Sequence, residues 1–239
     1  CGEITMVDQW VGRLIDRVKA MGLWENTAII FTSDHGFYFG EHGFFGKLRK
    51  PPQYPYAYQS PLFEEITRVP LLIYVPGLRP RKVEALVSLV DIMPTVLDLA
   101  GLEIPETLHG KSLLPLMRGE RDSLRDFVVS STFLYAPGEP SRIVDDWLRP
   151  VEKPHFSTIT TPEWTLLYST EDSPAYLYNI KNDPKQTRNV IDRNWDIAED
   201  LHMKFVKFLQ ETGTDKKRIS PRRRLSREYS EHPPGTELT

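Results

Sequence analysis

Residues 28–36 read Ala-Ile-Ile-Phe-Thr-Ser-Asp-His-Gly, and this stretch decides the fold. Its first six residues are an apolar run rich in β-favouring side chains, as expected for a strand buried on both faces of a parallel sheet. Before it, apolar side chains recur at helical spacing over residues 3–21, and Gly22 is placed to end that helix. A helix followed by a buried strand is the alternation typical of an α/β fold.

The alternation of helices and buried strands continues to about residue 125. Residues 69–75 predict a second buried strand that neighbours the first in one sheet, and residues 85–90 are compatible with a third. Asp91 is placed to cap a helix that runs to Ala100, and a shorter helical piece covers residues 112–117.

The pattern changes after about Asp126, where short strands alternate with turn signals and predict an antiparallel sheet. The strands are expected at residues 127–130, 156–160, 164–168 and 176–180, and a helix at residues 196–209.

We therefore predict three parts. Residues 1–125 belong to a large α/β domain, residues 126–212 form a small α+β subdomain, and residues 213–239 form a charged tail. The tail carries two short basic runs that could attract an acidic partner, but such a run is usually a solvated, flexible end.

The composition is that of an ordinary globular protein, with 239 residues, of which 40% are hydrophobic and 26% charged. The net charge of -3 gives no general electrostatic case for binding nucleic acid or a membrane. No apolar run approaches the roughly 18 residues that a membrane span needs. The one cysteine, Cys1, excludes a disulfide framework or a cysteine metal cluster within the chain.

Two segments after the first strand carry candidate chemistry. Asp34 and His35 stand just past the strand, where open α/β sheets bind ligands, and Gly36 permits the bend that would let both reach one ion. The alternative is a surface Asp-His pair in a turn. In the second segment, residues 39–43 are glycine-rich and Lys47 offers a cation to an anionic group. Taken alone, that segment is more often a loop with a solvated lysine.

Together these segments resemble the second half of a sulfatase of the alkaline-phosphatase-like superfamily. The match comprises Phe31-Thr-Ser-Asp-His-Gly36, Gly40-Glu-His-Gly43, Lys47 and Thr67-Arg-Val-Pro-Leu71. In having His directly after Asp, the motif resembles that of iduronate-2-sulfatases, choline sulfatases and phosphonate monoester hydrolases. Many other sulfatases place Asn at this position. Further matches lie at residues 26–27, before the first strand, and then in order at residues 91–101, 109–115 and 177–184.

The resemblance implies a fold and an activity. The fold would be α/β, part of an alkaline-phosphatase-like sandwich whose parallel or mixed sheet is flanked by helices, plus a small C-terminal antiparallel sheet with one helix. The activity would be hydrolysis of a sulfuric ester. Hydrolysis of phosphate or phosphonate esters is the alternative, because both substrates are tetrahedral oxyanions. A non-catalytic fragment or interaction module is a third interpretation.

The resemblance also implies roles for single residues. Asp34 and His35 would be two ligands of a divalent metal ion, and Lys47 would contact the sulfate ester and neutralise charge on the leaving oxygen. His42 would either line the substrate pocket or hydrogen-bond the loop, with equal weight. Glu65 and Arg68 are expected to be structural. We favour Ca²⁺ for the ion, with Mn²⁺ or Zn²⁺ as alternatives because of the imidazole.

Other parts of the family's active site have no counterpart in these residues. The formylglycine nucleophile derives from a Cys-x-Pro-x-Arg type motif, and Cys1 is followed by Gly-Glu-Ile-Thr. The paired aspartates that complete the metal site come from the family's N-terminal strands. We therefore expect part of a longer or split enzyme, whose partners are the N-terminal portion and a sulfate ester. The chain alone should be inactive. A homo-oligomer, export and a cytoplasmic location are all compatible with the sequence.

Overall fold

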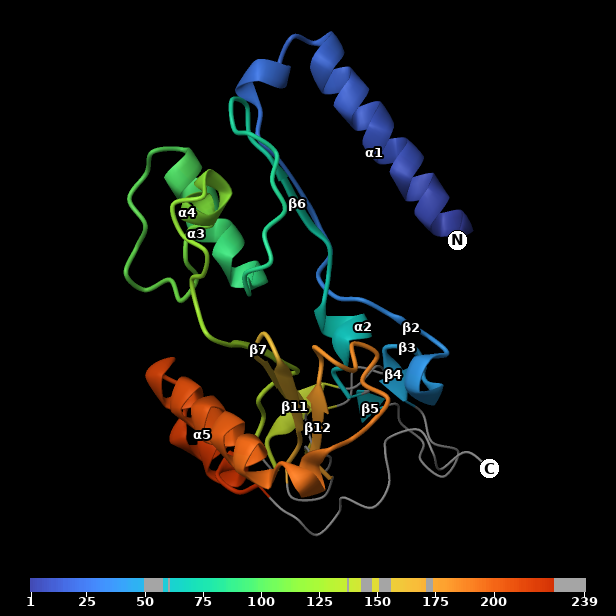
Figure 1. The fold of residues 1–239 in the computed structure, drawn as a ribbon, viewed down its shortest axis with the longest axis vertical. Coiled ribbons are helices and arrows are strands. Elements are labelled where there is room, and N and C mark those ends of the chain that lie inside the picture. Colours follow the sequence, from blue (N-terminus) through green and yellow to red (C-terminus); the bar gives the residue numbers. More distant parts are fainter. Residues whose placement is uncertain are drawn as a thin grey trace. The chain divides into compact units, whose positions relative to one another are not determined.

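The computed structural model describes residues 1–49, 58–59, 61–136, 138–142, 148–150, 156–170 and 174–225 (Figure 1). The chain forms two compact units, residues 1–33 with 70–83, and residues 34–69 with 84–239. Among the helices of the described residues, none has the length and apolarity that crossing a bilayer would take.

The first unit contains the predicted helix and both predicted strands. They are α1 (Gly2–Ala20), β1 (Ile29–Thr32) and β6 (Leu71–Tyr74), with a short turn, η1 (Trp24–Asn26), between α1 and β1. β1 and β6 are neighbours in one sheet, as predicted. They pair antiparallel, from Ile29 opposite Tyr74 to Thr32 opposite Leu71, so the parallel arrangement predicted for them is wrong. An apolar run indicates burial and says nothing of strand direction.

The apolar side chains of the first unit are open to solvent within this chain. No residue of α1 is buried, and neither strand is buried on both faces, as Leu72 illustrates with 60% exposure. The exposed side chains of α1 are Ile4, Met6, Val7, Trp10 and Leu14.

The second unit opens with two hairpins and a one-turn helix. The first hairpin pairs β2 (Tyr38–Phe39) with β3 (Phe45–Gly46) around η2 (Glu41–Gly43), and the second pairs β4 (Leu48–Arg49) with β5 (Tyr58–Gln59). The helix is α2 (Glu64–Thr67), which Figure 1 shows beside β2 and β3. Residues 50–57 and 60 lie outside the described residues.

The predicted helices near residues 91–100 and 112–117 are confirmed as α3 (Ile92–Leu99) and α4 (Leu114–Arg118). The prediction of a third strand at residues 85–90 is wrong, because the chain there enters η3 (Leu89–Asp91). The side chain of Ser88 accepts from the backbone of Asp91 while the Asp91 carboxylate accepts from the backbone of Ser88, a capping box that starts a helix.

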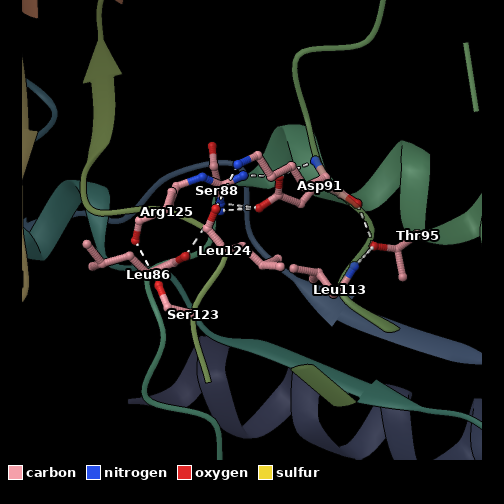
Figure 2. A network of polar contacts seen from close by, with 9 residues as sticks. Leu86, Ser88, Asp91, Thr95, Leu113, Ser123, Leu124 and Arg125 are labelled. Carbon is pink, nitrogen blue, oxygen red and sulfur yellow. Dashed lines mark hydrogen bonds and ion pairs between the residues drawn. The ribbon is translucent and has the colours of Figure 1, made fainter. Parts of the chain in front are cut away.

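Figure 2 shows that Asp91 also joins segments far apart in the chain. Its side chain is fully buried, and its carboxylate accepts from Ser88 N and Lys111 N, each at 2.8 Å. The two terminal guanidinium nitrogens of Arg125 donate to the two carboxylate oxygens, at 2.5 and 2.6 Å. The Asp91 carbonyl accepts from the hydroxyl of Thr95, which in turn accepts from Leu113 N. This network anchors the helices α3 and α4.

The predicted C-terminal sheet is confirmed. Its strands are β7 (Val128–Ser131), β10 (Ser157–Thr160), β11 (Trp164–Tyr168) and β12 (Tyr176–Asn179), all antiparallel in the order β12-β11-β10-β7. A separate hairpin pairs β8 (Pro140–Arg142) with β9 (Leu148–Pro150). The predicted helix is α5 (Trp195–Glu211), preceded by η4 (Ile191–Arg193).

Both faces of this sheet are buried, and one of them packs against the loops that carry the candidate site. On one face, Ile159, Leu166 and Leu177 pack with side chains of α5 such as Leu201 and Phe205. On the other face, the alternate side chains of the strands face the opposite way and pack with the loops that precede β6. The members of this second cluster are Leu167, Tyr176, Tyr178, Tyr38, Phe44, Leu62, Phe63 and Ile66.

The tail prediction is wrong for the residues up to Leu225. This segment forms α6 (Lys216–Ile219) and η5 (Ser220–Arg222), and Ile219 joins the core under α5. The buried Arg222 guanidinium donates to the carbonyls of Tyr135 and Arg218. The segment looked like a tail because one apolar residue among many charges leaves no periodic signal. Residues 226–239 lie outside the described residues.

The basic run in this segment has an intramolecular acidic partner. Lys217 lies 2.8 Å and Arg218 3.2 Å from the same carboxylate oxygen of Glu139. The hydrogen bond from Lys217, the backbone N–H of Ala136 and Arg218 lower the pKa of Glu139 to about 2. Glu139 therefore stays ionised at any ordinary pH and holds the basic turn of α6 against the loop after β7.

Candidate active site

The segment that carries Asp34 and His35 is held against α2. Gly36 N donates to the Ile66 carbonyl at 2.9 Å, so the backbone of the two segments is in direct contact. A Cβ on residue 36 would lie 1.8 Å from the Glu65 carbonyl oxygen, which is closer than any real contact. Only glycine fits here, and it fixes where the two preceding side chains emerge.

Gly36→Ala is therefore expected to displace this segment, because the clash is with backbone and no side chain can rotate away. We expect a lower melting temperature and a loss of the candidate site's geometry. Thermal unfolding of the variant, compared with Gly77→Ala, is the measurement. Gly77 has a positive φ, of 80°, which Gly36 does not have, and a Cβ at Gly77 would meet nothing within 4 Å, so the comparison sets the close contact at Gly36 against backbone strain alone. Equal melting temperatures for the two variants would contradict the steric account.

Two hydrogen bonds fix the tautomer of His35. Its Nδ1 lies 3.0 Å from the Gly36 carbonyl, which can only accept, so Nδ1 carries the proton. Its Nε2 lies 2.8 Å from the Lys47 ammonium, which can only donate, so Nε2 presents a lone pair. A histidine that donates through one nitrogen to a carbonyl is oriented to ligate a metal through the other, and an ion bound at Nε2 would take the place of the Lys47 ammonium there.

Asp34 lies beside that lone pair. Its Oδ2 is 3.5 Å from His35 Nε2, and its Oδ1 accepts from His35 N at 2.9 Å. Donor atoms about 3.5 Å apart can share an ion whose bonds are roughly 2.0–2.5 Å long, so the pair fits a divalent cation. Among the described residues, no group of three or more His, Cys, Asp or Glu side chains could hold an ion. If the pair holds an ion, Asp34 and His35 would therefore be two ligands of a set that needs others.

Lys47 completes the predicted trio. It follows β3, and Gly46, with a φ of 79°, turns the chain so that the ammonium reaches His35. An imidazole lone pair, a carboxylate and an ammonium thus gather at one point of the second unit. The arrangement can bind a cation through the first two groups and hold an anion beside the third.

His42 lies beneath the loop, with a side chain that is 9% exposed. Its Nε2 is 3.2 Å from a carboxylate oxygen of Glu65, and its ring stacks on Phe63 with centroids 3.7 Å apart. Its backbone has a positive φ of 53°, which is uncommon for a residue other than glycine. The geometry favours the loop-bonding role over pocket lining. Glu65 has the structural place expected for it, and Arg68 pairs with Glu64 at 3.6 Å.

Other contacts that support the site had no signal in the sequence. The buried Tyr38 hydroxyl donates to the Pro61 carbonyl at 2.5 Å and accepts from Phe63 N at 3.2 Å. The buried Gln186 accepts from Glu64 N at 2.7 Å and so ties the first turn of α2 to the loop after β12. Tyr38 and Gln186 are polar residues in irregular segments, and nothing in their spacing distinguishes them from surface residues.

Comparisons with known proteins find similarity to sulfatases. Residues 1–102 match the family model described as Sulfatase. An N-acetylglucosamine-6-O-sulfatase of Bacteroides thetaiotaomicron is 31% identical over 192 residues, which are 78% of this chain and 30% of that protein. An arylsulfatase of Clostridium perfringens is 30% identical over 195 residues, which are 80% of this chain and 34% of that protein.

A solved structure extends the likeness to the fold. The phosphonate monoester hydrolase from Silicibacter pomeroyi superposes with a TM-score of 0.67 at 26% identity, over 87% of this chain and 40% of that one. The chain therefore spans well under half the length of these similar proteins.

Proposed function

Because the chain belongs to the sulfatase family of the alkaline-phosphatase-like superfamily, we propose that it supplies Asp34, His35 and Lys47 to the active site of a sulfuric ester hydrolase. The complete enzyme would be this chain together with the part of the sulfatase architecture that it does not span. The observation that carries the proposal is the position of His35 Nε2, which lies 3.5 Å from the Asp34 carboxylate and 2.8 Å from the Lys47 ammonium.

Asp34 and His35 would hold a divalent ion, and we favour Ca²⁺ with Mn²⁺ or Zn²⁺ as alternatives. When bound, such an ion polarises the sulfate oxygens. The tautomer of His35 suits this role, because its Nδ1 proton is already committed to the Gly36 carbonyl. Calcium takes about six to eight oxygen ligands, so further ligands would come from the rest of the enzyme, as the resemblance to sulfatases implies.

Lys47 would hold the ester oxygen that leaves with the alcohol. Negative charge develops on that oxygen as its bond to sulfur breaks, and a fixed ammonium stabilises it more in the transition state than in the ground state. The nucleophile would be a formylglycine outside this chain. His42, Glu65 and Gly36 would keep the two loops in place against α2.

The exposed apolar surface of the first unit supports the same proposal. An α-helix with no buried residue and two strands with exposed Leu72 and Phe31 are unfavourable in water unless something covers them. We propose that the remaining part of the sulfatase domain packs on this surface.

Hydrolysis of phosphonate monoesters is the second candidate, because one structural relative bears that name. The complete enzyme should be assayed with 4-nitrophenyl sulfate and with the phenyl ester of a phosphonate at matched concentrations. We expect kcat/KM for the sulfate to exceed that for the phosphonate. The opposite ranking would replace the proposed function with the second candidate.

A further inference from the structure

The hairpin of β2 and β3 has two unlike faces. Tyr38 and Phe44 point inward, are buried, and join the core on the sheet face opposite α5. Phe39 pairs with Phe45 across the two strands, and Phe37, two residues before Phe39, shares their side of the ribbon. Phe37, Phe39 and Phe45 are 47%, 71% and 79% exposed, respectively.

An outer face of this composition is unusual for a hairpin. Antiparallel strands with one buried face ordinarily carry polar residues on the other. Here the ring centroids of Phe37 and Phe39 are 6.4 Å apart and those of Phe39 and Phe45 are 6.3 Å apart, so the rings form one continuous surface. We call Phe37, Phe39 and Phe45 the aromatic face. A contiguous exposed apolar surface usually marks a binding site.

The aromatic face begins at the candidate active site. The ring of Phe37 lies 5.7 Å from the ring of His35. At the other strand, Lys47 follows Phe45 by two residues, and its ammonium contacts His35 Nε2. A group that leaves from the ester oxygen held by Lys47 would therefore start beside Phe37, at the near end of the aromatic face.

We propose that the aromatic face binds the pyranose ring of the alcohol part of the sulfate ester. This assignment rests on the proposed function and names the substrate class of the same site. The C–H face of a sugar ring is apolar and packs on aromatic rings, which would remove that surface and the phenylalanines from water.

Glu41 favours a sugar over a plain hydrocarbon ring. This residue is exposed in the loop between the two strands, and its Oε2 accepts from Phe39 N at 2.6 Å. That backbone hydrogen bond lowers the pKa of Glu41, so the carboxylate is ionised at neutral pH. A carboxylate has room for several hydrogen bonds, and sugar hydroxyls are donors that it can accept from.

The test compares substrates with and without a sugar ring. The complete enzyme and its Phe37→Ala, Phe39→Ala and Phe45→Ala variants would be assayed with methyl glucosides sulfated singly at O2, O3, O4 or O6, with ethyl sulfate and with 4-nitrophenyl sulfate. We expect each variant to raise KM for the hydrolysed glucoside about 3- to 10-fold, with kcat and the KM for ethyl sulfate nearly unchanged. Phe39→Tyr and Phe45→Tyr retain a ring and should behave as the parent.

Phe133→Ala is the matched control, since Phe133 is 68% exposed elsewhere in the second unit. Equal KM changes for glucoside and ethyl sulfates, changes no larger than the control's, or a loss restricted to 4-nitrophenyl sulfate would overturn the pyranose assignment. So would a lowered melting temperature with unchanged KM, because another part of the enzyme would then cover the face. Hydrolysis of ethyl sulfate but of no glucoside sulfate would overturn the assignment while the proposed function stands. Failure to hydrolyse any sulfate would overturn both.

Discussion

Lys47→Ala is expected to lower kcat of the complete enzyme toward an aryl sulfate by about 100- to 1,000-fold, the usual effect of removing one group that stabilises developing charge. The ammonium lies 2.8 Å from His35 Nε2, which places it at the point where the ester would bind. Because the effect belongs to the transition state, KM should change far less than kcat. Steady-state kinetics with 4-nitrophenyl sulfate measure both.

A substrate with a better leaving group sharpens this test. If Lys47 stabilises charge on the leaving oxygen, the loss in kcat should shrink as the pKa of the leaving phenol falls. Lys185→Ala serves as the control, because Lys185 is an exposed lysine in the loop after β12. A Lys47→Ala enzyme with kcat similar to that of the control would show that Lys47 has no part in the reaction.

Asp91→Ala is expected to destabilise the second unit by about 3–5 kcal/mol, because it leaves the Arg125 guanidinium, which is 14% exposed, without its partner. The same change removes the acceptor of Ser88 N and Lys111 N, each of which lies 2.8 Å from the carboxylate. Urea unfolding followed by circular dichroism measures the loss.

Asp200→Ala is the matched control for this prediction. Asp200 pairs with Lys204 at 2.7 Å on the exposed side of α5, and exposed pairs contribute little to stability. We expect the unfolding midpoint of this variant to stay near that of the parent. Similar midpoints for the Asp91 and Asp200 variants would contradict the role assigned to the buried network.

The elements that the sequence predicted best are those with a strong period. The apolar spacing of α1 and α5 and the alternating strands of the C-terminal sheet led to helices and strands within a few residues of their observed bounds. The direction of β6 relative to β1 was not predictable, since direction depends on the path of the chain between them. The strand expected at residues 85–90 failed because the capping box of Ser88 and Asp91 outweighed a short apolar run.

The candidate site was likewise predictable from the sequence only in part. Asp34, His35 and Lys47 stood out because their motifs resemble a known family, and the structure brings all three together. The supporting contacts of Gly36 with Glu65 and of Gln186 with Glu64 join residues distant in the chain, so no local pattern encodes them. The aromatic face is visible only once the register of β2 and β3 separates outward-pointing phenylalanines from the buried aromatic residues.

The most direct test of the central claim is calorimetric titration with Ca²⁺ of the complete enzyme, of its Asp34→Ala variant and of residues 1–239 alone. The claim is that this chain contributes two ligands, Asp34 and His35, to a shared metal site. It predicts tight binding by the complete enzyme, a large loss in the Asp34→Ala variant, and weak binding by residues 1–239, whose two side chains offer about three of the six to eight donors that calcium takes. Unchanged affinity in the Asp34→Ala variant, or tight binding by residues 1–239 alone, would contradict it.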